Sequence, residues 1–481
     1  MKKKSIASNY ILNLIKTTLA ILFPLISYPY ISRILSVDGL GAVNFASSYV
    51  NYFILFSTFG INVFAIREGA KYRDDMKSLS NFASNMLLIN LGTAFISFLA
   101  LLLSLQLPAL AEYRPLILIF SLSILFNTFG MEWYFQLMEE YRYITLRAIL
   151  FQILSMILLF TFVKTAEHIY IYAFITVFAN VGSQCFNIFK LRKELVLFKE
   201  THYHIKEYVR PMFFIFLTLL AMNLYRFFDV TLLGFIKNDY SVGLYTLATK
   251  IVNIITTMVS SVTVILTPRL AYYYKNNQQA DFEKVAEDAF DFLMMLGLPI
   301  MIGIFIFSPF LVELVGGDSF QDSSIAVRIL SPMVLISSLN GLLVTPILMV
   351  VHREKIVLRT FVIALIFNVS SNLLSIFYLD FLGAALTTIL TELLICIFAI
   401  YNARDILHFG NRMKQFFIYA LSSLVIFPIW KIVSLFTLHH VGQFLLVILI
   451  SIILYFLLLF IQKERLIVFG LSFLQKKMGR R

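Results

Sequence analysis

Apolar runs long enough to cross a membrane follow one another along the whole chain, with short polar breaks between them. A bilayer core of about 30 Å requires about 20 mainly apolar residues per helical span. By this measure the sequence predicts an all-α, polytopic membrane protein with about 14 transmembrane helices. The predicted helices start near Tyr10, Leu40, Phe82, Pro115, Thr145, Ile169, Tyr208, Val242, Phe290, Ile325, Leu358, Leu382, Phe416 and Phe444.

Composition agrees with this interpretation. Of the 481 residues, 60% are hydrophobic and only 14% are charged, and the mean hydropathy is +0.86. Soluble domains are roughly half apolar and a quarter charged. The predicted spans leave no length of sequence for a separate soluble domain.

Basic residues alternate between the two sides of the predicted topology. Of the 39 Lys and Arg residues, 30 fall in breaks or tails on one side, including Arg147, Lys199 and Arg412. The other side carries five, which are Arg33, Arg114, Lys164, Lys237 and Arg328. By the positive-inside rule, both termini are predicted to be cytoplasmic. The net charge of +12 is therefore spread over one membrane face, which does not fit the concentrated basic stripe of a nucleic-acid binder.

An internal repeat divides the chain. An offset of 202 residues aligns Gly41–Asn51 with Gly243–Asn253, and an offset of 212 aligns Ile144–Arg147 with Ile356–Arg359. Because six helices separate the aligned units, the two halves have the same orientation, as in parallel transporter repeats. We predict an N-lobe of helices 1–6 (residues 1–200), a pseudo-symmetric C-lobe of helices 7–12 (201–405), and two extra helices with a basic tail (406–481).

Metal and cofactor chemistry has no sequence signature here. Cys185 and Cys396 lie in apolar stretches and form no CxxC pair, so packing is the favoured interpretation for both. No HExxH pattern and no GxxxxGK[ST] loop occurs. We expect no metal, no cofactor and no nucleotide.

Ionisable residues inside predicted spans are the candidates for function, because a charge at the centre of a membrane helix costs roughly 2.5 to 3.5 kcal/mol on insertion scales. Arg226 and Asp229 are the deepest, and their i,i+3 spacing places them on one helix face. One interpretation is an ion pair that only fixes packing. The other is a guanidinium available for a phosphate, which it can bind with two parallel hydrogen bonds.

Five further basic or acidic groups have similar alternatives. Lys250 and Lys16 are either cavity cations or side chains that extend to an interface. Glu132 and Glu392 are candidates for coupling to a proton or cation, or for ion pairs, and Glu392 is expected to be the more buried. Arg33 lies near the outer end of the first helix, where an interfacial anchor would look the same.

A motif at the start of the chain has the pattern PxxxxPYISRxLxxxGxG, represented by Pro24, Pro29, Tyr30, Ile31, Ser32, Arg33, Leu35, Gly39 and Gly41. With this motif, the first 75 residues resemble Wzx-type polysaccharide flippases of the multidrug/oligosaccharidyl-lipid/polysaccharide exporter superfamily. Phe59–Asp75 and Gly130–Ile153 are also similar, although Leu137 stands where relatives often have glycine.

The resemblance implies two six-helix lobes around a central cavity that opens alternately to either side of a bacterial cytoplasmic membrane. The implied cargo is an oligosaccharide on undecaprenyl diphosphate, moved outward for capsule, O-antigen or exopolysaccharide synthesis. Membrane lipids, a polysaccharide polymerase and a coupling ion, proton or sodium, are the implied partners. An anionic diphosphate would place Arg226 first among the cargo-binding candidates, followed by Lys250, Lys16 and Arg33.

Two other functions remain open at this point. A membrane glycan polymerase or ligase would need a large outer loop, but the longest outer loop is short, around Val315–Ser324. A drug or cation antiporter of the same superfamily would usually have twelve helices. Because no nucleophile and base can be placed together, we do not expect an enzyme.

Overall fold

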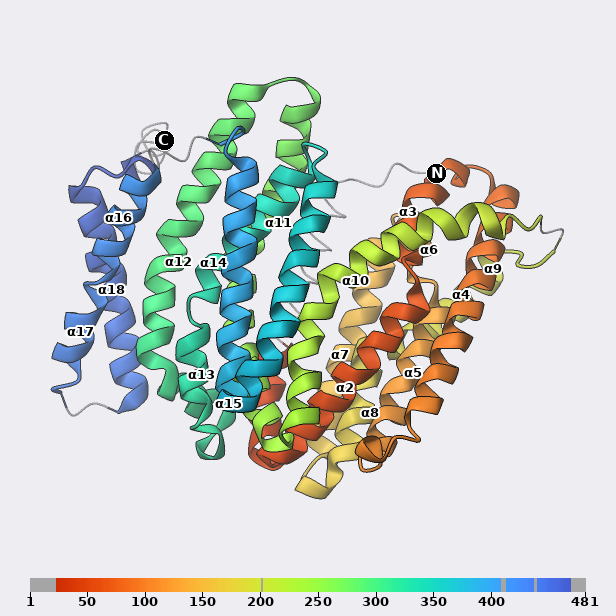
Figure 1. Ribbon diagram of the computed structural model, residues 1–481, viewed down its shortest axis with the longest axis horizontal. Helices are drawn as coiled ribbons and strands as arrows, with labels where there is room; N and C mark the ends of the chain where they lie inside the picture. Colours follow the sequence, from red (N-terminus) through yellow and green to blue (C-terminus); the bar gives the residue numbers. More distant parts are fainter. Residues whose placement is uncertain (1–22, 200–201, 408–411, 437–438, 469–481) are drawn as a thin grey trace. The chain divides into compact units, whose positions relative to one another are not determined.

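The computed structural model describes residues 23–199, 202–407, 412–436 and 439–468 (Figure 1). Within these ranges the regular structure is helical and no strand occurs. The contacts divide the chain into two compact units, Met1–Thr246 and Leu247–Arg481. The all-α fold class is confirmed.

The first unit starts with a helical segment at 23–34 that ends beside the cap of α2. Its further helices are α2 (Val37–Thr58), α3 (Ile61–Gly69), η1 (Ala70–Tyr72), α4 (Met76–Ser104), η2 (Pro108–Leu110), α5 (Arg114–Gly130), α6 (Glu132–Leu137), α7 (Tyr141–Phe162), η3 (Ala166–His168), α8 (Ile169–Val181), η4 (Gly182–Gln184), α9 (Cys185–Glu194), α10 (Ile205–Ile236) and the beginning of α11 (Asp239–Lys275).

The second unit contains the rest of α11 and the helices that follow it. These are α12 (Gln279–Gly316), η5 (Asp318–Phe320), α13 (Ser323–Leu330), α14 (Met333–Leu342), the π-helical turn η6 (Leu343–Met349), α15 (Glu354–Ala403), α16 (Arg412–Ser423), α17 (Ile426–Val433) and α18 (His440–Ile461).

The described residues contain nine helices that are long and apolar enough to cross a membrane, or up to eleven if each of two bent pairs is one span. One of them, α15, has 50 residues and includes a sharp kink at Asp380, where φ is 55° and ψ is −140°. The kink falls between two predicted spans, those starting near Leu358 and Leu382. These helices are consistent with the predicted total of about 14, which stays a prediction.

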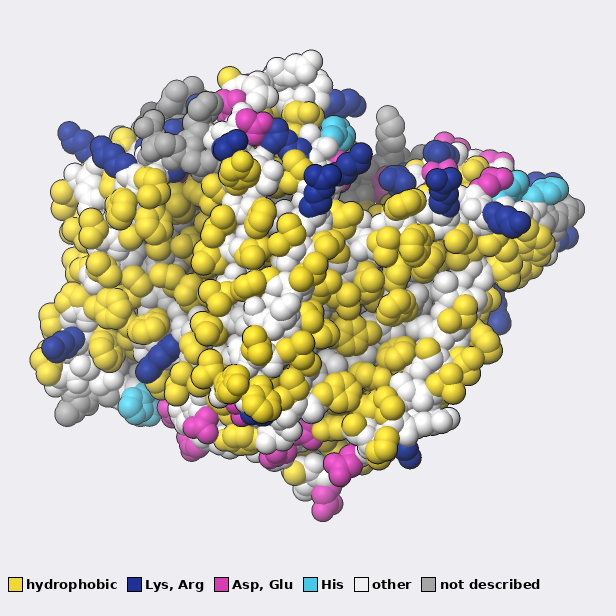
Figure 2. Space-filling model, viewed as in Figure 1, with side chains coloured by type: hydrophobic (Ala, Val, Ile, Leu, Met, Phe, Trp, Pro, Cys, Tyr) yellow, Lys and Arg dark blue, Asp and Glu magenta, His cyan; other side chains and the backbone are white. Residues whose placement is uncertain are grey.

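The surface of each unit fits a lipid environment. Hydrophobic side chains cover the helices between their ends, and charged side chains gather at the ends (Figure 2). On α4, for example, Phe95 and Ile96 are each 68% exposed. Several helices of both units expose large apolar side chains in this way. Such side chains are stable when they face acyl chains, whereas their exposure to water is unfavourable. The protein is a multi-pass membrane protein.

Two glycines allow α2 to cross the start of α11. A Cβ on Gly41 would lie 1.8 Å from the carbonyl oxygen of Asp239, and a Cβ on Gly243 would lie 2.3 Å from that of Val37. The crossing also joins Asn44 to Thr246, whose Oγ1 is 3.2 Å from Nδ2 of Asn44. Gly41 and Gly243 are 202 residues apart, as are their partners Val37 and Asp239, so equivalent positions contact each other reciprocally. This is what a parallel repeat with the predicted offset would give.

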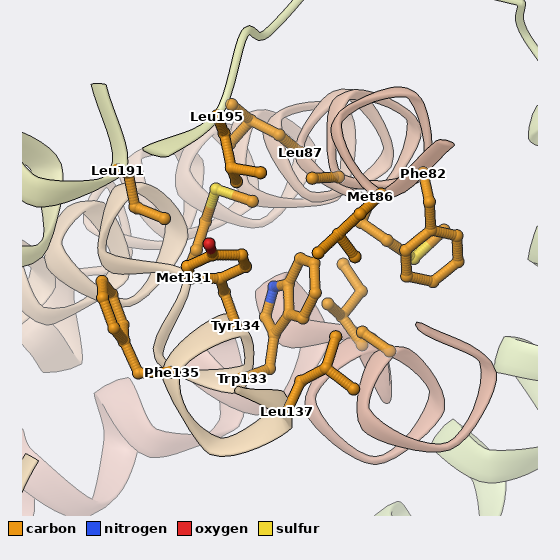
Figure 3. Packing of buried hydrophobic residues seen from close by; sticks show 14 of the residues in the cluster. Phe82, Met86, Leu87, Met131, Trp133, Tyr134, Phe135, Leu137, Leu191 and Leu195 are labelled. Carbon is orange, nitrogen blue, oxygen red and sulfur yellow. The ribbon is translucent and has the colours of Figure 1, made fainter. Parts of the chain in front are cut away.

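Buried aromatic side chains join short helices at one end of the first unit. Trp133, Tyr134 and Phe135 on α6 pack against α3, α4 and α9 (Figure 3). The α5–α6 break occurs at Met131, which has a φ of 39°. Leu137, which departs from the family pattern, is buried, and a Cβ on Gly69 would lie 2.9 Å from its Cδ2. The leucine therefore occupies close-packed space against α3.

Helix α10 packs with the helices that precede it in sequence. Gly60, which has a φ of 75°, lies against it, and a Cβ there would be 3.1 Å from the Met212 carbonyl oxygen. Gly234 of α10 packs on the ring of Phe45 in α2. This packing places the division between the units at Thr246, later than the predicted boundary at residue 200. The three-part division into two lobes and two extra helices stays a prediction.

Candidate functional site

The candidate site is centred on a bend in α10. The segments Ile205–Leu224 and Phe227–Ile236 meet at an angle of 56°. Arg226 lies at this bend, about 15 Å from the C-terminal end of α10 by helical rise. Its backbone is helical, but its side chain lies outside the described part of the structure. The bend therefore puts a residue that carries a positive charge near the middle of an apolar helix.

The backbone beyond the bend is held by hydroxyl groups. Ser48 of α2 donates a hydrogen bond to the Phe227 carbonyl oxygen at 3.1 Å, and Thr231 donates to the same oxygen at 3.0 Å. Polar side chains commonly satisfy carbonyl groups where a transmembrane helix is distorted. The Ser48 bond fixes the C-terminal part of α10 on α2.

Asp229 lies one turn beyond the bend and is only 2% exposed. Its Oδ2 accepts a hydrogen bond from the Tyr245 hydroxyl of α11 at 2.8 Å. Tyr52 of α2 and Thr231 are also close to this carboxylate. The structure thus places Asp229 in a buried polar cluster formed by α2, α10 and the start of α11. Pairing between Asp229 and Arg226 stays a prediction.

Glu132 has a structural partner that the sequence interpretation missed. Its Oε2 is 2.8 Å from Nη2 of Arg147, and the same guanidinium donates to Oδ1 of Asn187. The Asn187 amide in turn donates to the Gly130 carbonyl oxygen at 2.7 Å. The network links α6, α7 and α9. Arg147, which the charge pattern counts among the basic residues of one membrane face, lies in the second turn of α7 and is 6% exposed.

Glu392 is 4% exposed, which confirms that it is more buried than Glu132, whose side chain is 23% exposed. Nδ2 of Asn340 in α14 donates to its Oε2 at 2.7 Å and to its carbonyl oxygen at 3.0 Å. The neighbouring Thr391 accepts from the Asn368 amide at 3.3 Å. In the second unit, Glu392 therefore belongs to a buried polar region between α14 and the two halves of α15.

The other predicted cations have different positions. Arg33 is exposed at the end of the first described helical segment, where its Nη1 donates to the Pro29 carbonyl oxygen at 2.6 Å. Lys250 is half-buried in α11. Lys16 lies outside the described residues. The structure thus brings Asp229 into a defined cluster and leaves the roles of Arg33, Lys250 and Lys16 as predictions.

A second arginine has buried partners that the charge pattern does not reveal. Arg412, four residues before the predicted helix start near Phe416, begins α16 and is 9% exposed. Its guanidinium binds Glu287 and Asp291 of α12. Nearby, Arg465 is 2.6 Å from Asp288, and the Tyr419 hydroxyl donates to Glu464 at 2.8 Å. The charge pattern alone could not reveal this, because loop and helix-end arginines look alike in sequence.

In the described ranges, no group of three or more His, Cys, Asp or Glu side chains is arranged to hold a metal ion. The carboxylates of the polar clusters are bound instead by guanidinium, amide or hydroxyl groups. The clusters therefore join neighbouring helices through hydrogen bonds and ion pairs.

The sequence of this chain is similar to those of known protein families. A family model described as polysaccharide biosynthesis protein matches residues 6–273, and the MatE model matches residues 215–375. A candidate O-antigen transporter of Escherichia coli (strain K12) is 26% identical over 394 residues, which cover 78% of this chain and 91% of that protein.

Two groups of solved structures share the fold. The lipid II flippase MurJ in its inward closed conformation has a TM-score of 0.78 at 16% identity, covering 95% of this chain and all of that chain. An inward-facing multidrug resistance transporter of the MATE family has a TM-score of 0.56 at 14% identity, covering 80% of this chain and 97% of that one. These proteins are flippases and transporters, and the fold is a transporter fold rather than that of an enzyme.

The family match covers more than half of the chain and includes the opening motif that ends at Gly41. The chain belongs to the polysaccharide biosynthesis protein family, as a Wzx-type member of the multidrug/oligosaccharidyl-lipid/polysaccharide exporter superfamily.

Proposed function

We propose that this protein is a flippase that moves an undecaprenyl-diphosphate-linked oligosaccharide from the cytoplasmic to the outer face of a bacterial cytoplasmic membrane, with both termini in the cytoplasm. The product would serve capsule, O-antigen or exopolysaccharide synthesis. One structural observation carries the proposal: a membrane-spanning helix bends by 56° at an arginine, beside a buried polar cluster.

The bend suits both requirements of such a transporter. A diphosphate crossing the apolar core needs a positive group at mid-depth, and a guanidinium can bind phosphate with two parallel hydrogen bonds. Alternating access needs a helix whose halves can change their angle. The outer half of α10 is tied to α2 through Ser48, whereas the inner half packs with α3 and α4. The bend between them is the proposed hinge.

Asp229 has two alternative proposed roles. It either neutralises Arg226 in one conformation or takes part in coupling to a proton or sodium ion. Glu392 and Glu132 are the other coupling candidates. Delivery of the flipped product to a polymerase completes the proposal and requires no covalent step by this protein.

Transport by purified protein in liposomes tests the proposal. A lipid-linked oligosaccharide should become accessible to an externally added glycosidase without ATP. Arg226→Ala should lower the rate at least about tenfold, the loss expected for one charge-assisted bidentate contact, and Arg226→Lys should restore part of it. Protein abundance and melting temperature should stay near those of the unmodified protein.

Two results would contradict the assignments. If Arg226→Ala/Asp229→Ala transports normally, the two residues form an ion pair needed only for packing. If the unmodified protein moves a drug cation and leaves the glycolipid in place, it is an antiporter. That second candidate is favoured by the MatE match over residues 215–375.

A further inference from the structure

The segment between α9 and α10 is bound to α4 in a regular way. We call the described residues 195–199 and 202–204, taken together, the strap. In its first part, the Val196 amide donates to Oγ of Ser80 at 3.3 Å and the Phe198 amide donates to Oγ of Ser84 at 2.9 Å. In this part of the strap, two amides that are two residues apart therefore bind side chains that are one turn apart on α4.

The second part of the strap repeats this pattern on the adjacent row of α4. The His202 amide donates to Oδ1 of Asn81 and the His204 amide donates to Oδ1 of Asn85, both at 2.9 Å. The Asn85 amide also donates to the His202 carbonyl oxygen at 2.9 Å.

The two pairs of contacts have the same spacing. Four residues of α-helix rise about 6.0 Å, so the two side chains of each pair on α4 lie one turn apart. The amides that they bind are two residues apart in the strap, which turns at Phe198, where φ is 62°. The strap is held in one register, with these amides satisfied by protein groups.

This register determines which side chains face outward. Leu195 is buried and Leu197 is partly buried against the aromatic cluster of α4 and α6, and Leu195 is seen there in Figure 3. Val196 is 60% exposed, Phe198 46% and Tyr203 61%. Alternation thus directs one set of apolar residues into the protein and a second set away from it. Large apolar groups held outward in this way would be unfavourable in water.

The same surface is rich in exposed bases. Lys199 lies in the strap, Arg192 and Lys193 end α9, and Lys206 and Arg210 lie in the first turns of α10. Of the nearby acids, Glu194 is bound by Lys190 and Glu207 approaches His204. Figure 2 shows Lys, Arg and His side chains beside hydrophobic ones at this end of the first unit.

The strap also lies at the edge of the apolar layer, because it joins the ends of two membrane-spanning helices, Ala166–Glu194 and the first segment of α10. Outward apolar side chains combined with basic ones match the boundary between acyl chains and anionic headgroups. We propose that the strap and its flanking bases form a docking surface for the anionic phospholipids of the surrounding bilayer.

This docking is separate from cargo binding and does not depend on the proposed transport function. It would hold the first turns of α10 at the membrane surface. The proposed occupant is a bulk phospholipid of the bilayer.

Fluorescence quenching in nanodiscs tests the proposal. Tyr203→Cys, in a chain also carrying Cys185→Ala and Cys396→Ala, is labelled with bimane. Doxyl-labelled phosphatidylglycerol should quench the probe at least about twofold more than doxyl-labelled phosphatidylcholine at equal mole fraction, because the bases enrich the anionic lipid. Raising the salt from about 50 mM to 500 mM should reduce this difference, since screening shortens the range of the attraction.

Matched charge variants complete the experiment. Lys199→Gln/Lys206→Gln/Arg210→Gln should abolish the preference for phosphatidylglycerol. Lys275→Gln/Lys284→Gln/Lys414→Gln, which removes three exposed bases from the second unit, should preserve it. If the triple variant of the strap is unstable, the salt dependence of quenching in the protein with all its bases intact decides.

Three results would overturn the proposal. Equal quenching by the two lipids would show no charge selection, and an equal loss in both triple variants would show only an effect of net charge. No quenching by either lipid would place the strap away from the bilayer and favour a soluble protein partner.

Discussion

Arg147 and Arg412 are both buried, but their charges are balanced differently. Arg147 binds one carboxylate, Glu132, whose side chain is 23% exposed, and completes its hydrogen bonds with the neutral amide of Asn187. Arg412 binds two carboxylates, Glu287 and Asp291, whose side chains are 18% and 3% exposed. The first arrangement is close to neutral with some access to solvent. The second places more acid than base in a buried contact.

The two arginines also connect different kinds of segment. Arg147 and Glu132 are 15 residues apart, on neighbouring helices. Arg412 lies 121 and 125 residues from its partners and fastens α16 to α12. At the other end of α17 and α18, Ile429 and Val433 pack against α12 through Ile302 and Phe307. The final helices are therefore attached by a charged contact and an apolar contact, whereas Arg147 mainly fixes a local helix connection.

The largest expected effect is the loss of Arg412. Arg412→Ala leaves the buried Asp291 and the partly exposed Glu287 without their guanidinium, and breaking a buried ion pair in this way costs about 3–5 kcal/mol. The melting temperature of the detergent-solubilised protein should fall clearly. Lys414→Ala, which removes a nearby exposed charge, should leave it almost unchanged. Equal melting temperatures for the two variants would show that Arg412 is not a fastening contact.

A smaller effect is expected for Arg147. Arg147→Ala removes hydrogen bonds to a charged and a neutral acceptor, at a cost of about 1.5–3 kcal/mol, because water can reach Glu132. Thermal unfolding should therefore shift less than in Arg412→Ala, and the exposed Arg142→Ala is the matched control. A larger shift for Arg147→Ala than for Arg412→Ala would reverse the comparison.

The smallest effect concerns an ion pair outside the membrane-spanning segments. Arg353 donates to Asp405 at 2.8 Å, and this hydrogen bond lowers the pKa of the Asp405 carboxyl below its usual value. Because the folded-state pKa is the lower one, the stabilisation is present above the unfolded pKa of about 3.9 and is lost as the pH falls through the folded pKa.

Asp405→Asn should therefore lower the melting temperature slightly at pH 6. The difference from the unmodified protein should shrink below about pH 3.9 and disappear once the pH is below the folded-state pKa of Asp405. Asp405 and Arg353 are partly exposed, so the change should be smaller than in either buried cluster. A difference that grows on acidification would show that the pair is not the source of the effect.

Part of this architecture could be predicted from the sequence because it depends on local composition. The apolar runs predicted the membrane-spanning helices, and the break between the runs starting near Leu358 and Leu382 coincides with the kink at Asp380. The repeat offset of 202 residues predicted equivalent positions before any contact was visible. The family was also predictable, because its opening motif lies within 75 consecutive residues.

The candidate site was only partly predictable. The sequence identified Asp229, Glu132 and Glu392 as costly charges inside helices, but not their partners Tyr245, Arg147 and Asn340. The burial of Arg147 and Arg412 could not be predicted, because the burial of the first turns of a helix depends on neighbouring helices. The same holds for the strap, since Ser80 and Asn85 are ordinary polar residues in sequence.

The sequence by itself determined that lipid is the solvent, where the chain crosses the apolar layer, and which positions are equivalent in its two halves. These properties follow from hydrophobicity, which adds up along a segment. The tertiary structure decided which charge meets which partner and how close two helices can come, as at Gly41 and Asp239. Such contacts depend on the rotation and crossing of helices distant in sequence, because hydrogen bonds and ion pairs act only over a few ångströms.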